Sequence, residues 1–120
     1  MLFDFERFTT SAKLAYRRID NPVYSLDEAL SVFRYYFETY ELVRGETHPM
    51  ISLAQIQRII ERMPHADSES MDSGLCDYDP EQYRDMIDQH FITNYQHCDY
   101  NINHFFSGRI REMRYFETLY

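Results

Sequence analysis

The sequence predicts an all-α protein, a compact bundle of about five helices with one long acidic loop. Capping residues stand before several segments, apolar residues then recur at spacings of three and four, and strand signals are poor. At 120 residues the chain fits a single helical domain, 1–120, which can bury a core without metal or disulfide support. Because 20 residues are Phe or Tyr and none is Trp, we expect a core of aromatic rings with polar tips.

The first two helices are predicted before and after the turn at 20–22. The N-terminal segment has apolar residues at helical spacing: Phe5, Phe8, Ala12, Ala15, Tyr16 and Ile19. The second helix is predicted over 26–44, because Ser25 and Glu28 have the spacing of a capping box and Gly45 supplies a C-terminal stop. Its apolar stripe is Leu26, Leu30, Phe33, Phe37 and Tyr40.

Two further helices are predicted at 53–63 and 80–91. Ser52 begins a second capping sequence, this time S-x-x-Q, and Pro64 stops the helix that follows. Asp79 is a good N-cap before a proline at the first helical position. Apolar residues then share one face of each helix.

The last helix is predicted to be long, with a possible break at Ser107-Gly108, since glycine inside a helix costs about 1 kcal/mol relative to alanine. Its apolar stripe is Ile102, Phe105, Phe106, Ile110, Met113 and Phe116. Residues 64–78 show no periodicity and are polar, so we expect a mobile acidic loop there.

A short sequence echo precedes two of these helices. Cys76-Asp77-Tyr78-Asp79 and Cys98-Asp99-Tyr100-Asn101 differ only at their last residue. The last residue of each can accept hydrogen bonds from the first turn of a helix, while the cysteine and tyrosine pack behind it. We therefore interpret the echo as capping rather than as an internal repeat.

Charge is the most unusual feature of the chain, because the net charge of −8 is concentrated in one section. Residues 61–99 hold ten carboxylates against two arginines, whereas 1–60 are nearly balanced and 100–120 are slightly basic. Such a field repels nucleic acid and attracts basic surfaces. We expect a protein partner with a basic surface, bound by Asp67, Glu69, Asp72, Asp77, Asp79, Glu81, Asp85 and Asp88.

The alternative interpretations are that these acids only keep an aromatic-rich domain in solution, or that the chain itself binds nucleic acid. Nucleic-acid binding would use six basic residues: Lys13, Arg17, Arg18, Arg109, Arg111 and Arg114. These side chains make a small phosphate footprint on a protein of this net charge, and the arginines could pair with the acidic section instead.

No motif indicates an enzyme, a cofactor or a metal site. Cys76, His90, His97, Cys98 and His104 are suitable zinc ligands, but they lack the close pairs that structural zinc sites use. The acidic loop does not fit the calcium-binding pattern of an EF-hand, and nucleophile and phosphate-binding motifs are missing. We expect a non-enzymatic, cytoplasmic protein without cofactor, because there is no signal peptide and no membrane-spanning run.

The segment from His97 to the end of the chain, with its core CDYNINHFFSGRIR at 98–111, resembles the C-terminal signature of small acidic proteins carried on mobile elements of Gram-positive gut bacteria. The resemblance extends to the capped helices at 26–44 and 53–63. It implies a phage or conjugative-element context, in which short acidic proteins include anti-CRISPR proteins. Such proteins often act as nucleic-acid mimics that occupy nucleic-acid sites.

Overall fold

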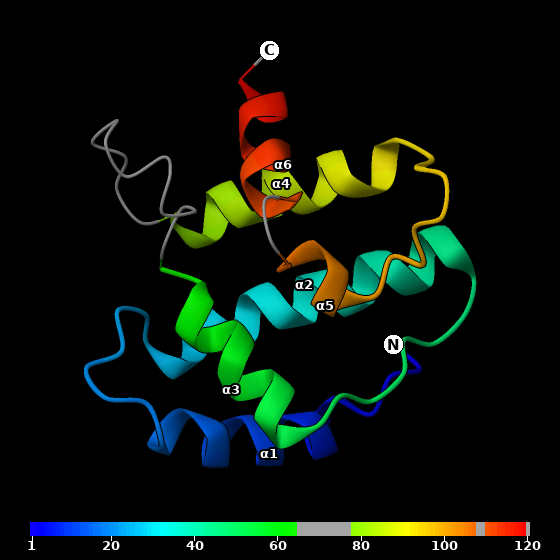
Figure 1. Ribbon diagram of the computed structural model, residues 1–120. Coiled ribbons are helices and arrows are strands. Elements are labelled where there is room, and N and C mark those ends of the chain that lie inside the picture. Colours follow the sequence, from blue (N-terminus) through cyan, green and yellow to red (C-terminus); the bar gives the residue numbers. More distant parts are fainter. Residues whose placement is uncertain (65–77, 108–109, 120) are drawn as a thin grey trace.

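The computed structural model describes residues 1–64, 78–107 and 110–119. Within these residues all regular secondary structure is helical, which confirms the all-α prediction. The described residues form six helices (Figure 1): α1 Phe5–Arg17, α2 Leu26–Arg44, α3 Leu53–Arg62, α4 Pro80–Ile92, α5 Ile102–Phe105 and α6 Ile110–Thr118.

Capping boxes begin α2, α3 and α4, as the sequence predicts. In α2 the Ser25 side chain accepts the backbone N–H of Glu28, whose carboxylate accepts the backbone N–H of Ser25. The helix ends at Gly45, which has φ 69° and therefore a backbone conformation that favours glycine. The predicted limits of α3 and α4 are each within one residue of those observed.

The predicted C-terminal helix is interrupted where the sequence indicates a possible break, at Ser107-Gly108. Helix α5 ends at Phe105, and α6 begins at Ile110. The break changes the phase of α6, so the predicted apolar stripe does not continue to face the core. Met113 and Phe116 are exposed, and the buried residues of α6 are Arg111 and Arg114.

Helix α2 lies at the centre of the fold and packs against both α1 and α4 (Figure 1). Helix α3 packs across α1, while α6 packs on α4 and touches α5. Helices α2 and α4 run in the same direction, so their C-terminal ends lie on the same side of the molecule. The whole is a flattened body of 38 × 36 × 22 Å.

The core between these helices is built from aromatic rings, as the composition predicts. Phe3 stacks on Phe37 with ring centroids 4.0 Å apart. Several buried tyrosines direct their hydroxyls to backbone carbonyls, and the hydroxyl of Tyr36 donates to the carbonyl of Tyr100 at 2.7 Å. The buried His48 ring accepts the backbone N–H of Ile102 at 3.0 Å. These bonds join distant segments while satisfying buried polar groups.

The Cys-Asp-Tyr echo is explained by capping where the structure describes it. Asp79 accepts the backbone N–H of Gln82 at the start of α4, and Asn101 caps α5 in the same manner. Tyr78 and Tyr100 are both buried behind these caps. Cys76 and Asp77 lie outside the described residues.

Candidate partner-binding surface

The outward face of α4 carries an acidic stripe, which we define as Glu81, Asp85 and Asp88. These residues are spaced by four and three, so their side chains share one side of the helix, and all three are exposed. Within the described residues, the carboxylates of Glu81 and Asp85 make no hydrogen bond or ion pair, whereas Asp88 accepts a hydrogen bond from the hydroxyl of Tyr35. The stripe therefore presents negative charge to solvent.

Asp79 has a different role from the three acids of the stripe. Its side chain caps α4, and Gln82 completes the capping box by accepting the backbone N–H of Asp79. Of the eight predicted partner-binding acids, four lie on or before α4 in the described part of the chain. The other four, Asp67, Glu69, Asp72 and Asp77, lie outside it.

A groove runs between α2 and α4 beside the acidic stripe, and we call it the α2–α4 groove. Its volume is about 420 Å³. The lining residues are Tyr35, Glu38, Thr39, Leu42 and Val43 from α2 and Asp88, Phe91 and Ile92 from α4. Leu42 is 86% exposed and Ile92 is 76% exposed, so the groove has an apolar rim that is open to solvent.

A tyrosine and carboxylates give one end of this groove its polarity. The hydrogen bond from Tyr35 to Asp88 joins α2 to α4, and burial together with this bond raises the pKa of Tyr35 to about 12. The guanidinium of Arg84 lies 5.8 Å from the centre of the Tyr35 ring. Glu38 is paired with Arg34 at 2.8 Å on the exposed side of α2.

The groove was not predicted from the sequence, although apolar residues near the ends of two helices indicate it. Leu42 and Val43 do not belong to the core-facing stripe of α2, and Ile92 follows the predicted end of α4. Exposed apolar side chains at neighbouring helix ends are a feature of interaction sites when they gather in one place. Only the packing of α2 on α4 shows that these three residues line one groove.

The arginines of α6 do not neutralise the acidic stripe. Arg114 is 3% exposed and Arg111 is 5% exposed. Arg114 pairs with Glu117 of its own helix at 2.7 Å, and Arg111 donates to the backbone carbonyl of Arg62. Both guanidinium groups are thus used to hold α6 in place.

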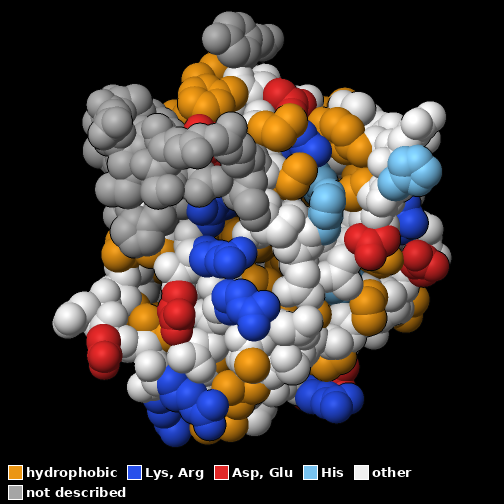
Figure 2. Space-filling view, viewed as in Figure 1, with side chains coloured by type: hydrophobic (Ala, Val, Ile, Leu, Met, Phe, Trp, Pro, Cys, Tyr) orange, Lys and Arg blue, Asp and Glu red, His pale blue; other side chains and the backbone are white. Residues whose placement is uncertain are grey.

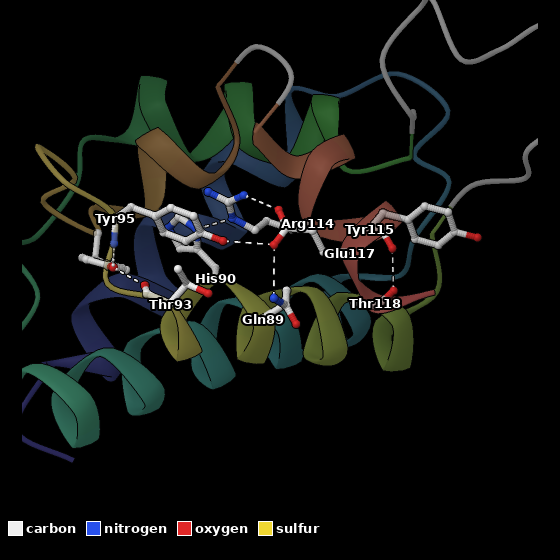
Figure 3. A network of polar contacts seen from close by, with 9 residues as sticks. Gln89, His90, Thr93, Tyr95, Arg114, Tyr115, Glu117 and Thr118 are labelled. Atoms are coloured by element: carbon white, nitrogen blue, oxygen red, sulfur yellow. Dashed lines mark hydrogen bonds and ion pairs between the residues drawn. The ribbon is translucent and has the colours of Figure 1, made fainter. Parts of the chain in front are cut away.

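Arg114 is the centre of a buried polar network between α4 and α6 (Figure 3). Its Nε donates to Nδ1 of His90 at 2.9 Å, and its guanidinium carbon lies 3.9 Å from the centre of the Tyr95 ring. Glu117 also accepts from the hydroxyl of Tyr95 and the amide of Gln89. Burial, with the nearby charge of Arg114, lowers the pKa of His90 to about 3.

The predicted set of nucleic-acid-binding residues is therefore corrected, because two of its members, Arg111 and Arg114, are buried. Arg109 lies outside the described residues. The remaining members, Lys13, Arg17 and Arg18, are exposed on and just after α1. Side chains of Lys and Arg gather over α3 and at one end of α1 on the face shown in Figure 2.

Helix α3 supplies the basic residues that the sequence interpretation omitted. Arg58 and Arg62 are exposed and stand four residues apart, a spacing that could have revealed them. Arg62 also donates to the carbonyl of Phe106 at 3.2 Å. The basic residues of α1 and α3 are thus on helices other than the one that bears the acidic stripe.

The residues considered as metal ligands do not assemble in the described part of the chain, which holds no group of three or more suitable side chains. Cys98 is a half-buried free thiol, and His97 beside it is exposed. No helix in the described ranges has the length and apolar character to cross a bilayer. Comparison with protein-family models, curated proteins and solved structures finds no match to the chain.

Proposed function

We propose that this chain is a non-enzymatic protein-binding inhibitor or regulator, anti-CRISPR-like in character, whose acidic surface occupies a basic, nucleic-acid-binding site on a partner protein. The observation that carries the proposal is the exposed stripe Glu81, Asp85 and Asp88, which the arginines of α6 leave without ion pairs among the described residues. A partner with lysine and arginine side chains supplies the charge that this surface lacks.

The spacing of the stripe supports a role as a nucleic-acid mimic. Four residues of helix advance by about 6 Å, so successive carboxylates lie at separations of the same order as neighbouring phosphates on a strand. Concentrated negative charge also speeds encounter with a basic site, an effect that falls as salt rises. Such a partner would be met in the cytoplasm, the compartment that the sequence predicts.

Charge reversal tests the proposal. The chain is immobilised and exposed to an extract of the cells that produce it, beside a Glu81→Lys/Asp85→Lys variant. A control variant, Asp20→Lys/Glu61→Lys, changes the net charge equally at exposed residues away from α4. We expect a protein that the wild type and the control retain at low salt and the α4 variant does not. Retention of the same proteins by all three would contradict the proposal.

The second candidate function is a helical nucleic-acid-binding accessory protein, favoured by the exposed basic side chains of α1 and α3. A gel shift at low salt separates the two functions. The acidic-surface proposal predicts no shift of DNA or RNA by the protein alone. A shift that an Arg17→Glu/Arg58→Glu variant abolishes would favour the second function.

A further inference from the structure

We propose that the α2–α4 groove binds an amphipathic helix of the partner, with apolar side chains in the groove and lysine or arginine side chains against the acidic stripe. The inference rests on the proposed function, since it names the chemistry of the segment that the acidic surface would bind. It adds an apolar contact that charge alone does not require.

The groove and the acidic stripe form one continuous surface. Ile92 follows Asp88 by four residues, so Glu81, Asp85, Asp88 and Ile92 lie in a single row along α4. The row changes from charged to apolar at its C-terminal end, where Leu42 and Val43 complete the apolar rim from α2. A ligand lying along this row meets carboxylates at one end and aliphatic side chains at the other.

The shape of the groove favours a helix as its occupant. Two neighbouring helices with the same direction form a trough into which the side chains of a third helix can pack. Its lining residues on α2 recur at three and four, which matches anchors on one face of a ligand helix. Its volume of about 420 Å³ accommodates side chains rather than a whole domain.

The negative charge around the groove favours a basic ligand helix. Asp88 lines the groove and Asp85 stands three residues before it in the same row of α4, while the C-terminal ends of α2 and α4 add partial negative charge on the same side. Of the nearby cations, Arg34 is paired with Glu38 and Arg84 lies over the Tyr35 ring. A basic amphipathic helix complements this surface. A second copy of the chain does so less well, because each copy carries a net charge of −8.

Labelled synthetic peptides test the proposal directly. The first, of about 16 residues and four helical turns, has leucines at i, i+3, i+7 and i+10 and lysines on both flanks. In the second, alanine replaces each leucine. The third is a scramble of the first that spreads leucines around the helix. Fluorescence anisotropy at physiological salt should show the first peptide binding at least about tenfold more tightly than the others.

Variants of the protein locate the site. Leu42→Ser/Ile92→Ser should weaken binding of the first peptide about tenfold or more and leave the second unchanged. Leu14→Ser/Val23→Ser is the matched control, because both residues are exposed and far along the chain from the groove residues. It should bind as the wild type does. Circular dichroism confirms that each variant is folded.

Each other outcome overturns the inference in a distinguishable way. Equal binding of leucine and alanine peptides, or no binding of either, would contradict the proposed apolar contact in the groove. The charge-reversal experiment would then still decide the proposed function. A concentration-dependent dimer that Leu42→Ser/Ile92→Ser converts to a monomer would assign the groove to a second copy. Peptide binding that depends on Leu42 and Ile92 but not on Glu81 and Asp85 would overturn the proposed contact of basic side chains with the acidic stripe, and would also contradict the acidic-surface function.

Discussion

Helices α4 and α6 pack against each other and use their charges in opposite ways. The carboxylates of α4 point to solvent, and Glu81 and Asp85 have no ion pair within the described residues. The guanidinium groups of α6 point inward, where Arg114 and Arg111 bond to groups of neighbouring helices. Arginines on a neighbouring helix therefore do not imply that the acidic stripe is neutralised.

This difference separates structural charge from available charge. A buried arginine is retained only where hydrogen-bond acceptors and a carboxylate satisfy it, because a buried charge without partners is very costly. Exposed carboxylates have no such requirement, and surface charges of this kind contribute little to folding. Substitutions in the two helices should thus affect different properties.

The largest effect is expected from Arg114→Ala. Removing this guanidinium leaves Nδ1 of the buried His90 without its donor and removes the ion pair with Glu117, so the free energy of unfolding should fall by about 3 kcal/mol. Urea denaturation measures the change. The matched control is Arg58→Ala, an exposed helical arginine that should change stability by less than about 0.5 kcal/mol. Equal losses in the two variants would show that the network is not a structural requirement.

The second prediction concerns pH. Burial holds His90 neutral with a pKa of about 3, whereas an unfolded histidine has a pKa near its ordinary value of about 6.5. Below that value the unfolded chain takes up a proton that the folded chain does not. Stability is therefore highest above about pH 6.5 and should fall by about 2 kcal/mol between pH 7 and 5.

His90→Gln tests this assignment, since an amide oxygen can still accept from Arg114 and does not titrate. Its stability should depend less steeply on pH between 7 and 5 in chemical denaturation experiments. Some dependence should remain, because burial also lowers the pKa of His48. A variant as pH-sensitive as the wild type would refute the role of His90.

A smaller effect is expected within the acidic section itself. Asp79→Ala removes the N-cap of α4 and should lower the free energy of unfolding by about 1 kcal/mol. Asp85→Asn, six residues further along the chain on the exposed face of α4, should change it by less than about 0.5 kcal/mol. Thermal denaturation of both variants decides whether Asp79 belongs with the structural charges. Identical melting curves would argue that it does not.

The smallest effect is expected at the hydrogen bond from Tyr35 to Asp88. The pKa of Tyr35 is about 12, so this phenol ionises at higher pH than an ordinary tyrosine, mainly because of burial and then because of Asp88. Asp88→Asn should therefore lower the pKa of Tyr35. Difference absorbance titration of wild type and variant, with Tyr35→Phe to identify the signal, measures the shift. An unchanged pKa would mean that Asp88 does not act on this phenol.

The sequence predicts helices best where caps are local. The spacing of Ser25 with Glu28 identifies the start of α2 from residues that lie close together, and α3 and α4 begin with equivalent caps. The buried face of α6 was not predictable in this way. The break before Ile110 changes the helical phase, so an apolar periodicity carried across it assigns the wrong side to the core.

The candidate site was predictable in its charge and not in its shape. The carboxylates of α4 follow from composition and helical spacing, and all three lie on one exposed stripe. The groove needs residues from two helices about 50 positions apart, such as Leu42 and Ile92, whose proximity arises from tertiary packing. No local sequence pattern predicts that contact.

The central claim is that the partner binds the α4 side of the molecule. Hydrogen exchange of the chain, alone and with the protein retained in the charge-reversal experiment, tests it most directly. We predict slower exchange over Pro80–Ile92 and the C-terminal half of α2 when the partner is bound, with no change over Leu53–Arg62. Protection confined to α1 and α3, with unchanged exchange in α4, would contradict the account.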